Sequence, residues 1–157
     1  MSPSADILDL SSFEPSRSAA LERLSAFLPY AGKHYERHRN YDDRSPGSIT
    51  VSGLSPYLRY RVITEAEVIR AVLDEHGLRN AEKFIQEVVW RTYWKGWLQM
   101  RPAVWIEYQQ ELAYTQHRLE QEPDLKVRHQ SAVQGQTGID GFDEWVSQLV
   151  TTGYVHN

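Results

Sequence analysis

The stretch "NAEKFIQEVVWRTYWKGWLQ" (80–99) carries the clearest structural signal in the chain. At about 100° per residue, four apolar residues share one face: Phe84, Ile85, Val88 and Val89. The other side carries one carboxylate, one guanidinium and three indoles, from Glu87, Trp90, Arg91, Trp94 and Trp97. The pattern therefore predicts a helix with a core face and an aromatic face. The aromatic face either packs inside protein, with Glu87 and Arg91 as a local ion pair, or lines a pocket for a planar ligand.

Helical signals continue on both sides of this stretch. Thr64 and Glu67 form a capping box ahead of an apolar stripe, and Gly77 is a stop signal, which predicts a helix over 64–77. Further helices are expected over 16–30, about 102–120 and 140–150, the last with Asp140 as its cap and Gly153 as its stop. The polar connection 121–138 has room for a short helix. The only β-branched run, "SITVS" (48–52), is flanked by loop residues, so the expected fold class is all-α.

Length, cysteine content and net charge exclude several classes of protein. The chain has 157 residues, which suits one domain over 16–157 behind a lead-in segment over 1–15. It has no Cys, which excludes disulfides, thiolate catalysis and Cys-based metal sites. A formal net charge of −4 gives no global attraction to nucleic acid, although a local basic patch remains compatible with it. Without a long apolar run or a basic leader, we expect a cytoplasmic protein that does not span a membrane.

Two short patterns allow more than one interpretation. In "SGLSPYL" (52–58), Ser52 and Ser55 flank Gly53, an arrangement that suits either an ordinary turn with a helix cap or a cradle for phosphate oxygens. His34 and His38 are four residues apart on an expected helix, as in some metal sites. No third ligand is close to them in sequence, so surface histidines without a metal are the favoured interpretation.

Four motifs follow one another in a definite order: "YERHRNYDD" (35–43), "TVSGLSPYLRY" (50–60), "QEVVWRTYW" (86–94) and "GQTGIDGFDEWVSQLVTTGYVHN" (135–157). Over about residues 27–157 this order resembles the flavin-binding helical domain of the photolyase and cryptochrome family. That family has a Tyr shortly before an Arg, a Ser-x-Leu-Ser-Pro-Tyr-Leu cradle, a Glu-x-x-Trp-Arg helix and a Gly-Trp-x-His-Asn helix start. The chain departs from it where Val51 replaces Thr and Tyr154 replaces Trp.

The resemblance implies a role for each matching residue. Contacts to FAD are implied for Tyr35, Ser52, Leu54, Ser55 and Arg91. Catalytic contacts to the damaged base are implied for Glu87, Trp90 and Asn157. Contacts to damaged DNA are implied for Arg39, Glu87, Trp90, Trp94 and Asn157. In this family a flipped pyrimidine dimer lies against the flavin, where an indole recovers lost stacking and a carboxyl group stabilises developing charge.

Two functions follow from the resemblance. The first is light-driven repair of pyrimidine dimers in DNA by electron transfer from reduced FAD. The second is a non-catalytic fragment, or a module that binds flavin or a partner without repairing DNA. Because the chain ends at the His-Asn motif, we expect part of the flavin domain, with weak or absent FAD binding. Either self-association or a missing C-terminal half would then cover its aromatic face.

Overall fold

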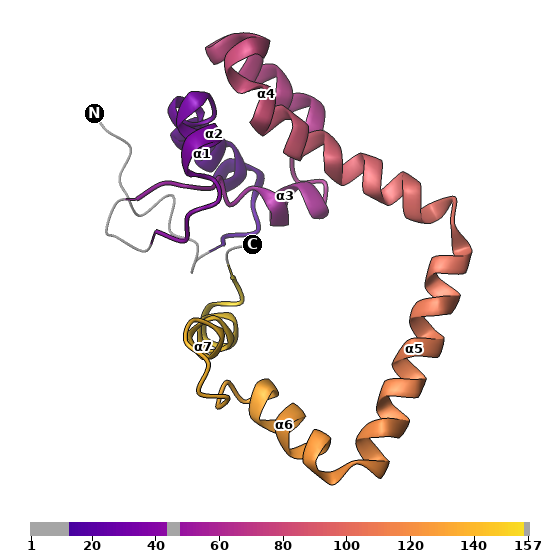
Figure 1. Ribbon diagram of the computed structural model, residues 1–157. Helices are drawn as coiled ribbons and strands as arrows, with labels where there is room; N and C mark the ends of the chain where they lie inside the picture. Colours follow the sequence, from indigo (N-terminus) through magenta and orange to yellow (C-terminus); the bar gives the residue numbers. More distant parts are fainter. Residues whose placement is uncertain (1–12, 44–47, 156–157) are drawn as a thin grey trace. The chain divides into compact units, whose positions relative to one another are not determined.

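The computed structural model describes residues 13–43 and 48–155, and every regular element in these two ranges is helical. The predicted all-α class is therefore confirmed. In chain order (Figure 1), the elements are α1 (Arg17–Phe27), the 3-10 helix η2 (Leu28–Tyr30), α2 (Lys33–His38), α3 (Ser55–Arg59), α4 (Glu65–Gln99), α5 (Pro102–Gln121), α6 (Pro123–Val133) and α7 (Phe142–Thr152). Within the described ranges, no helix combines the length and the apolar character that a bilayer crossing requires.

The chain divides into two compact units, a first unit that ends at Tyr93 and a second unit Trp94–Val155. The first unit contains α1 to α3 and most of α4, and the second contains the end of α4 with α5 to α7. The sequence pattern suggested one domain over 16–157, and this assignment stays a prediction.

Helix α4 is two helices joined at Gly77, as the sequence predicted. Gly77 has φ 67° and ψ 163°, which no α-helix contains, so the chain changes direction there. The first arm (65–76) and the second arm (78–99) then lie beside one another, because Arg91 Nε is 3.9 Å from Glu65 Oε1 across 26 residues of sequence. The kink thus brings the charged start of α4 next to the motif residues of its second arm.

The backbone conformation at Gly77 gives a first testable prediction. This region of φ and ψ is nearly exclusive to glycine, and a Cβ added at Gly77 would meet no atom within 4 Å. Gly77→Ala should therefore lower the free energy of unfolding by about 1–3 kcal/mol through the backbone alone. Gly96→Ala is the matched control, since Gly96 is helical and equally open. It should raise stability by about 0.5–1 kcal/mol. Urea unfolding of both variants checks this, and equal effects at the two glycines would contradict it.

A cluster of aromatic rings forms the centre of the first unit. The ring centroid of Phe84, on the second arm, lies 5.3 Å from that of Phe27 and 5.1 Å from that of Tyr35, which it meets edge-on. The core around them is apolar, and every α-helix of the first unit contributes to it: Ala20, Leu24, Phe27, Ala31, Tyr35, Leu54, Tyr57, Leu58, Ile63, Val68, Val72, Ala81, Phe84 and Val88. This core holds α2, the 51–54 loop and the second arm in one body.

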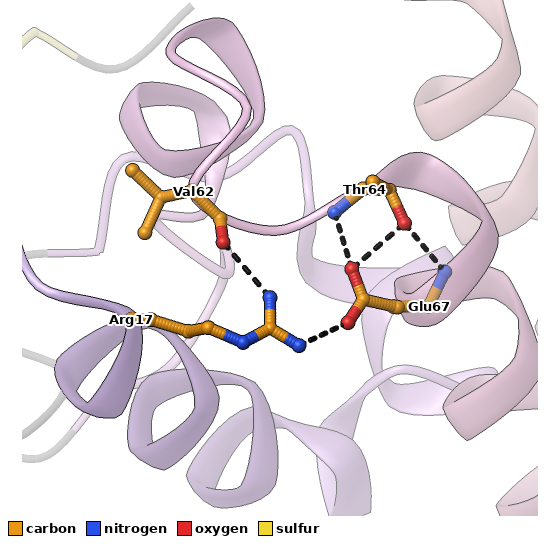
Figure 2. Close-up of polar contacts among 4 residues, drawn as sticks. All are labelled: Arg17, Val62, Thr64 and Glu67. Carbon is orange, nitrogen blue, oxygen red and sulfur yellow. Dashed lines mark hydrogen bonds and ion pairs between the residues drawn. The ribbon is translucent and has the colours of Figure 1, made fainter.

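The predicted capping box begins α4 and also fastens it to α1 (Figure 2). Thr64 N donates to Glu67 Oε2 at 2.8 Å, and Glu67 N donates to Thr64 Oγ1 at 3.3 Å. The other carboxylate oxygen of Glu67 pairs with Arg17, whose Nη1 donates to the carbonyl of Val62 at 3.0 Å. One carboxylate therefore satisfies a helix start and joins two elements that are 50 residues apart.

These contacts make the stability of the first unit depend on pH. Hydrogen bonds from Arg17 first, and then from Thr64, lower the pKa of Glu67 from 4.5 to about 2. The stabilisation by Glu67 is therefore complete above pH 4.5 and is lost as the pH falls towards about 2. Unfolding midpoints of the wild type and Glu67→Gln should differ at neutral pH and converge over that range. A difference that stays constant down to the acid end would show that the ion pair contributes nothing.

The second unit has no comparable core. Helices α5, α6 and α7 contain no fully buried residue. Large aromatic side chains are exposed on α5, where Trp105 and Tyr108 stack with ring centroids 5.4 Å apart. Arg101 lies 4.3 Å from the ring centroid of Trp97. An exposed surface of this kind is typical of a region that packs against further protein.

The start of α7 differs from the sequence prediction. The N-cap is Gly141, and Asp140 makes no capping bond. The carboxylate of Asp143 turns back instead and accepts bonds from Thr137 N at 3.0 Å, Thr137 Oγ1 at 2.7 Å and Gly138 N at 2.7 Å. These bonds lower the pKa of Asp143 and tie the Thr-Gly loop to the helix. The predicted stop at Gly153 is correct, with φ 72°.

Candidate functional site

Three of the motif residues meet where α2 ends against the second arm of α4. Arg39 is the C-cap of α2, and its guanidinium forms an ion pair with Glu87. Tyr35 lies one turn earlier on α2 with 8% of its surface exposed, close enough to Arg39 and Glu87 for both to shift the pKa of its phenol. We call these residues the Tyr35–Arg39–Glu87 cluster. The core contact of Tyr35 with Phe84 fixes the distance between the two helices at this point.

The cluster sits at the border between core and solvent. Burial first, and the nearby Glu87 carboxylate second, raise the pKa of Tyr35, while the Arg39 guanidinium opposes this. The phenol is therefore protonated at neutral pH and has a proton to donate. The side chains of Arg39 and Glu87 are 29% and 42% exposed, so a ligand can reach both from solvent.

Trp90 follows Glu87 by three residues on the second arm. It is 44% exposed and meets Tyr93 edge-on, with ring centroids 5.1 Å apart. Its ring helps to line a cavity of about 420 Å³, together with Leu78, Glu82, Ile85, Gln86, Val89 and Tyr93. Val89, which the pattern placed on the core face, is 49% exposed in this cavity, so that assignment was wrong. The structure thus gives the second arm an apolar hollow as well as the polar cluster.

The 51–54 loop leads directly into α3, as the sequence predicted. Gly53 has φ 63°, and the hydroxyl of Ser52 accepts a bond from Leu54 N at 3.3 Å. Leu54 is 1% exposed and anchors the loop in the core. Ser55 is exposed at the first position of α3. The Ser52 hydroxyl therefore orders the turn, whereas Ser55 is open to solvent.

The remaining motif residues have separate surroundings. Arg91 approaches Glu65, whose carboxylate also accepts a bond from Arg61 at 2.6 Å. This partner of Arg91 was not predictable from the local pattern, because Glu65 lies 26 residues away and only Arg61 and Glu65 have the spacing of four that indicates a helical ion pair. Trp94 belongs to the second unit and is 49% exposed. Asn157 lies outside the described residues.

Comparison with known proteins finds sequence similarity to two photo-lyases. Over 151 residues the chain is 29% identical to a deoxyribodipyrimidine photo-lyase of Synechococcus sp., which covers 92% of this chain. Over 146 residues, 88% of the chain, it is 29% identical to a deoxyribodipyrimidine photo-lyase of Neurospora crassa. These two matches support the resemblance to photolyases that the motif order indicated.

The match covers only part of these two photolyases. The chain spans 30% of the length of the Synechococcus protein and 22% of the Neurospora protein. No family model matches the chain, and no solved structure does. The similarity to photolyases therefore rests on these two relatives and is consistent with the helical class of the structure.

Proposed function

We propose that this chain provides part of an FAD site of photolyase type, and that its parent activity is light-driven repair of pyrimidine dimers in DNA. The carrying observation is that motif residues from distant segments, Tyr35 and Arg39 on one side and Glu87 on the other, meet in one cluster. Two photolyases match across these same segments. FAD itself would supply the light-absorbing electron donor.

The residues present suit the phosphate end of FAD. Ser55 offers an exposed hydroxyl beside the Gly53 backbone, and Arg91 offers a guanidinium that a carboxylate holds only loosely at 3.9 Å. Hydroxyls, amides and guanidinium groups are the donors that phosphate oxygens accept from. Ser52 and Leu54 would act by ordering the turn, and Tyr35 by its hydroxyl.

The substrate end of the proposed site involves Glu87 and Trp90. A half-exposed indole offers a face on which a flipped base can stack. The Glu87 carboxylate lies within reach of solvent and could accept a hydrogen bond from the damaged base. Damaged DNA is therefore the proposed partner, with Trp94 and Asn157 assigned to it by the resemblance alone.

A second candidate function is a partner-binding module without repair activity. The exposed aromatic rings of Trp90 and Trp94, and of Trp105 on α5, favour it, because such surfaces usually pack against protein. The partner would be a second copy of the chain or the further segments that longer photolyases contain. Light scattering would detect the second copy as a concentration-dependent dimer.

Titration with FAD and with riboflavin tests the proposed cofactor site. FAD should bind weakly, because a few hydrogen bonds of about 0.5–1.5 kcal/mol each cannot offset the cost of immobilisation. It should still bind better than riboflavin, which lacks the diphosphate. Ser52→Ala combined with Ser55→Ala should remove this preference, and Ser147→Ala on exposed α7 is the control.

Flavin fluorescence measures both titrations, and visible absorption after desalting measures retention. Equal affinity for FAD and riboflavin would overturn the phosphate assignment. A stoichiometric yellow protein after desalting would contradict the expected weakness of the site.

A further inference from the structure

The side chain of Arg39 is already engaged in the structure. Its guanidinium pairs with Glu87 and lies near the phenol of Tyr35, whose pKa it lowers. A guanidinium in an ion pair offers less net charge to a DNA phosphate than a free one does. The resemblance alone assigned Arg39 to DNA, so its contacts within the protein call for a different role.

Glu87 gains a defined position from this contact. An exposed glutamate on a helix has three rotatable side-chain bonds and exchanges between several rotamers. The Glu87 side chain is 42% exposed, and its ion pair comes from another element, 48 residues away in sequence. Because the planar guanidinium fork accepts a carboxylate in few geometries, the pair restricts where the Glu87 oxygens lie.

Arg39 is in turn held by the core. Its backbone N–H donates to the carbonyl of Tyr35 at 2.9 Å at the end of α2. The ring of Tyr35 meets Phe27 and Phe84 edge-on, with centroids 6.1 and 5.1 Å away. The order of the packed core therefore reaches the Glu87 carboxylate through Tyr35 and Arg39.

We propose that Arg39 is a positioning residue, braced by Tyr35, which holds the Glu87 carboxylate in place for the damaged base. This inference rests on the proposed function, because it gives Glu87 a substrate to meet. Arg39 then contacts Glu87 within the protein and not a DNA phosphate. Arg39 then determines how well damaged DNA is distinguished from undamaged DNA, and contributes little to general DNA affinity.

The two roles predict different behaviour in a binding assay. Loss of a phosphate contact weakens binding to damaged and undamaged DNA equally, and lowers the slope of log affinity against log salt by about 1. Loss of a positioning contact weakens binding to damaged DNA alone and leaves the salt slope unchanged. The probes are a duplex with one cis-syn thymine dimer and the same duplex without it.

Five variants complete the binding experiment. Arg39→Gln and Glu87→Gln should each reduce the preference for the dimer about five- to tenfold, the equivalent of one ordinary hydrogen bond. The double variant should lose no more than either single one, because both remove the same contact. Arg39→Lys should restore only part of the preference, since an ammonium lacks the planar fork. Arg37→Gln, an exposed residue on the same helix, is the matched control for charge.

The outcomes distinguish failure of the positioning role of Arg39 from failure of the proposed repair function. Equal loss on both duplexes with a smaller salt slope in Arg39→Gln, or additive losses in the double variant, would overturn the positioning role. A wild type with no preference for the dimer would reject the proposed function instead.

Urea unfolding of the wild type, Arg39→Gln, Glu87→Gln and the double variant then tests the positioning contact without DNA. A coupling of about two- to fivefold in the folding equilibrium supports it, and strict additivity rejects it.

Discussion

Phe84→Ala is expected to lower the free energy of unfolding of the first unit by about 3–5 kcal/mol, the largest effect that we predict for a single change. Phe84 is 4% exposed and contacts the rings of both Phe27 and Tyr35. Its removal leaves a cavity between the second arm of α4 and the two helices it packs on. The Tyr35 ring should also lose the packing that fixes its position, so Tyr35 should hold Arg39 in place less firmly.

Urea unfolding followed by far-UV circular dichroism measures this change. Val89→Ala is the control, because Val89 lies on the same arm and is 49% exposed. It should alter stability by less than about 0.5 kcal/mol. Similar losses in the two variants would mean that the core face of the second arm is not the one described above.

Leu54→Ala is expected to have the next largest effect, a loss of about 2–5 kcal/mol. Leu54 is 1% exposed and is the N-cap of α3, so its side chain attaches the 51–54 loop to the core. If this loop is the phosphate cradle, the variant should also lose the preference for FAD over riboflavin, although no hydroxyl has been removed. The same unfolding and flavin titrations measure both consequences.

Leu78→Ala serves as the control for Leu54, since Leu78 is 62% exposed at the start of the second arm. It should change neither stability nor flavin preference appreciably. A stable Leu54→Ala protein that keeps its preference for FAD would show that the loop needs no anchor in the core.

The contacts between the helices explain why the two halves of the candidate site depend on each other. Tyr35, Leu54 and Phe84 belong to one core, so a change at any of them should be felt at the others. The double variant Phe84→Ala with Leu54→Ala should accordingly be less destabilised than the sum of its single variants, once either change has loosened the shared core.

Local rules within one helical turn determined most of the secondary structure. The Thr64–Glu67 box, the Gly77 stop and the Gly153 stop depend on residues three or four positions apart, and all three were predictable from the sequence. The start of α7 was mispredicted, because both Asp140 and Asp143 suit a helix start. Only the folded loop shows that Asp143 binds Thr137 and Gly138.

The order of the motifs along the chain also predicted, without coordinates, which residues form a photolyase-like site, and that assignment stays a prediction. Only the tertiary structure decided which of them meet. The residues of the Arg39–Glu87 pair are 48 positions apart in sequence, and those of the Glu65–Arg91 approach are 26 apart. Val89 lines a cavity, although helical spacing had placed it on the core face with Val88. Helical periodicity specifies the direction in which a side chain points from the axis of its helix. Which residue it contacts depends on how a second helix packs against the first.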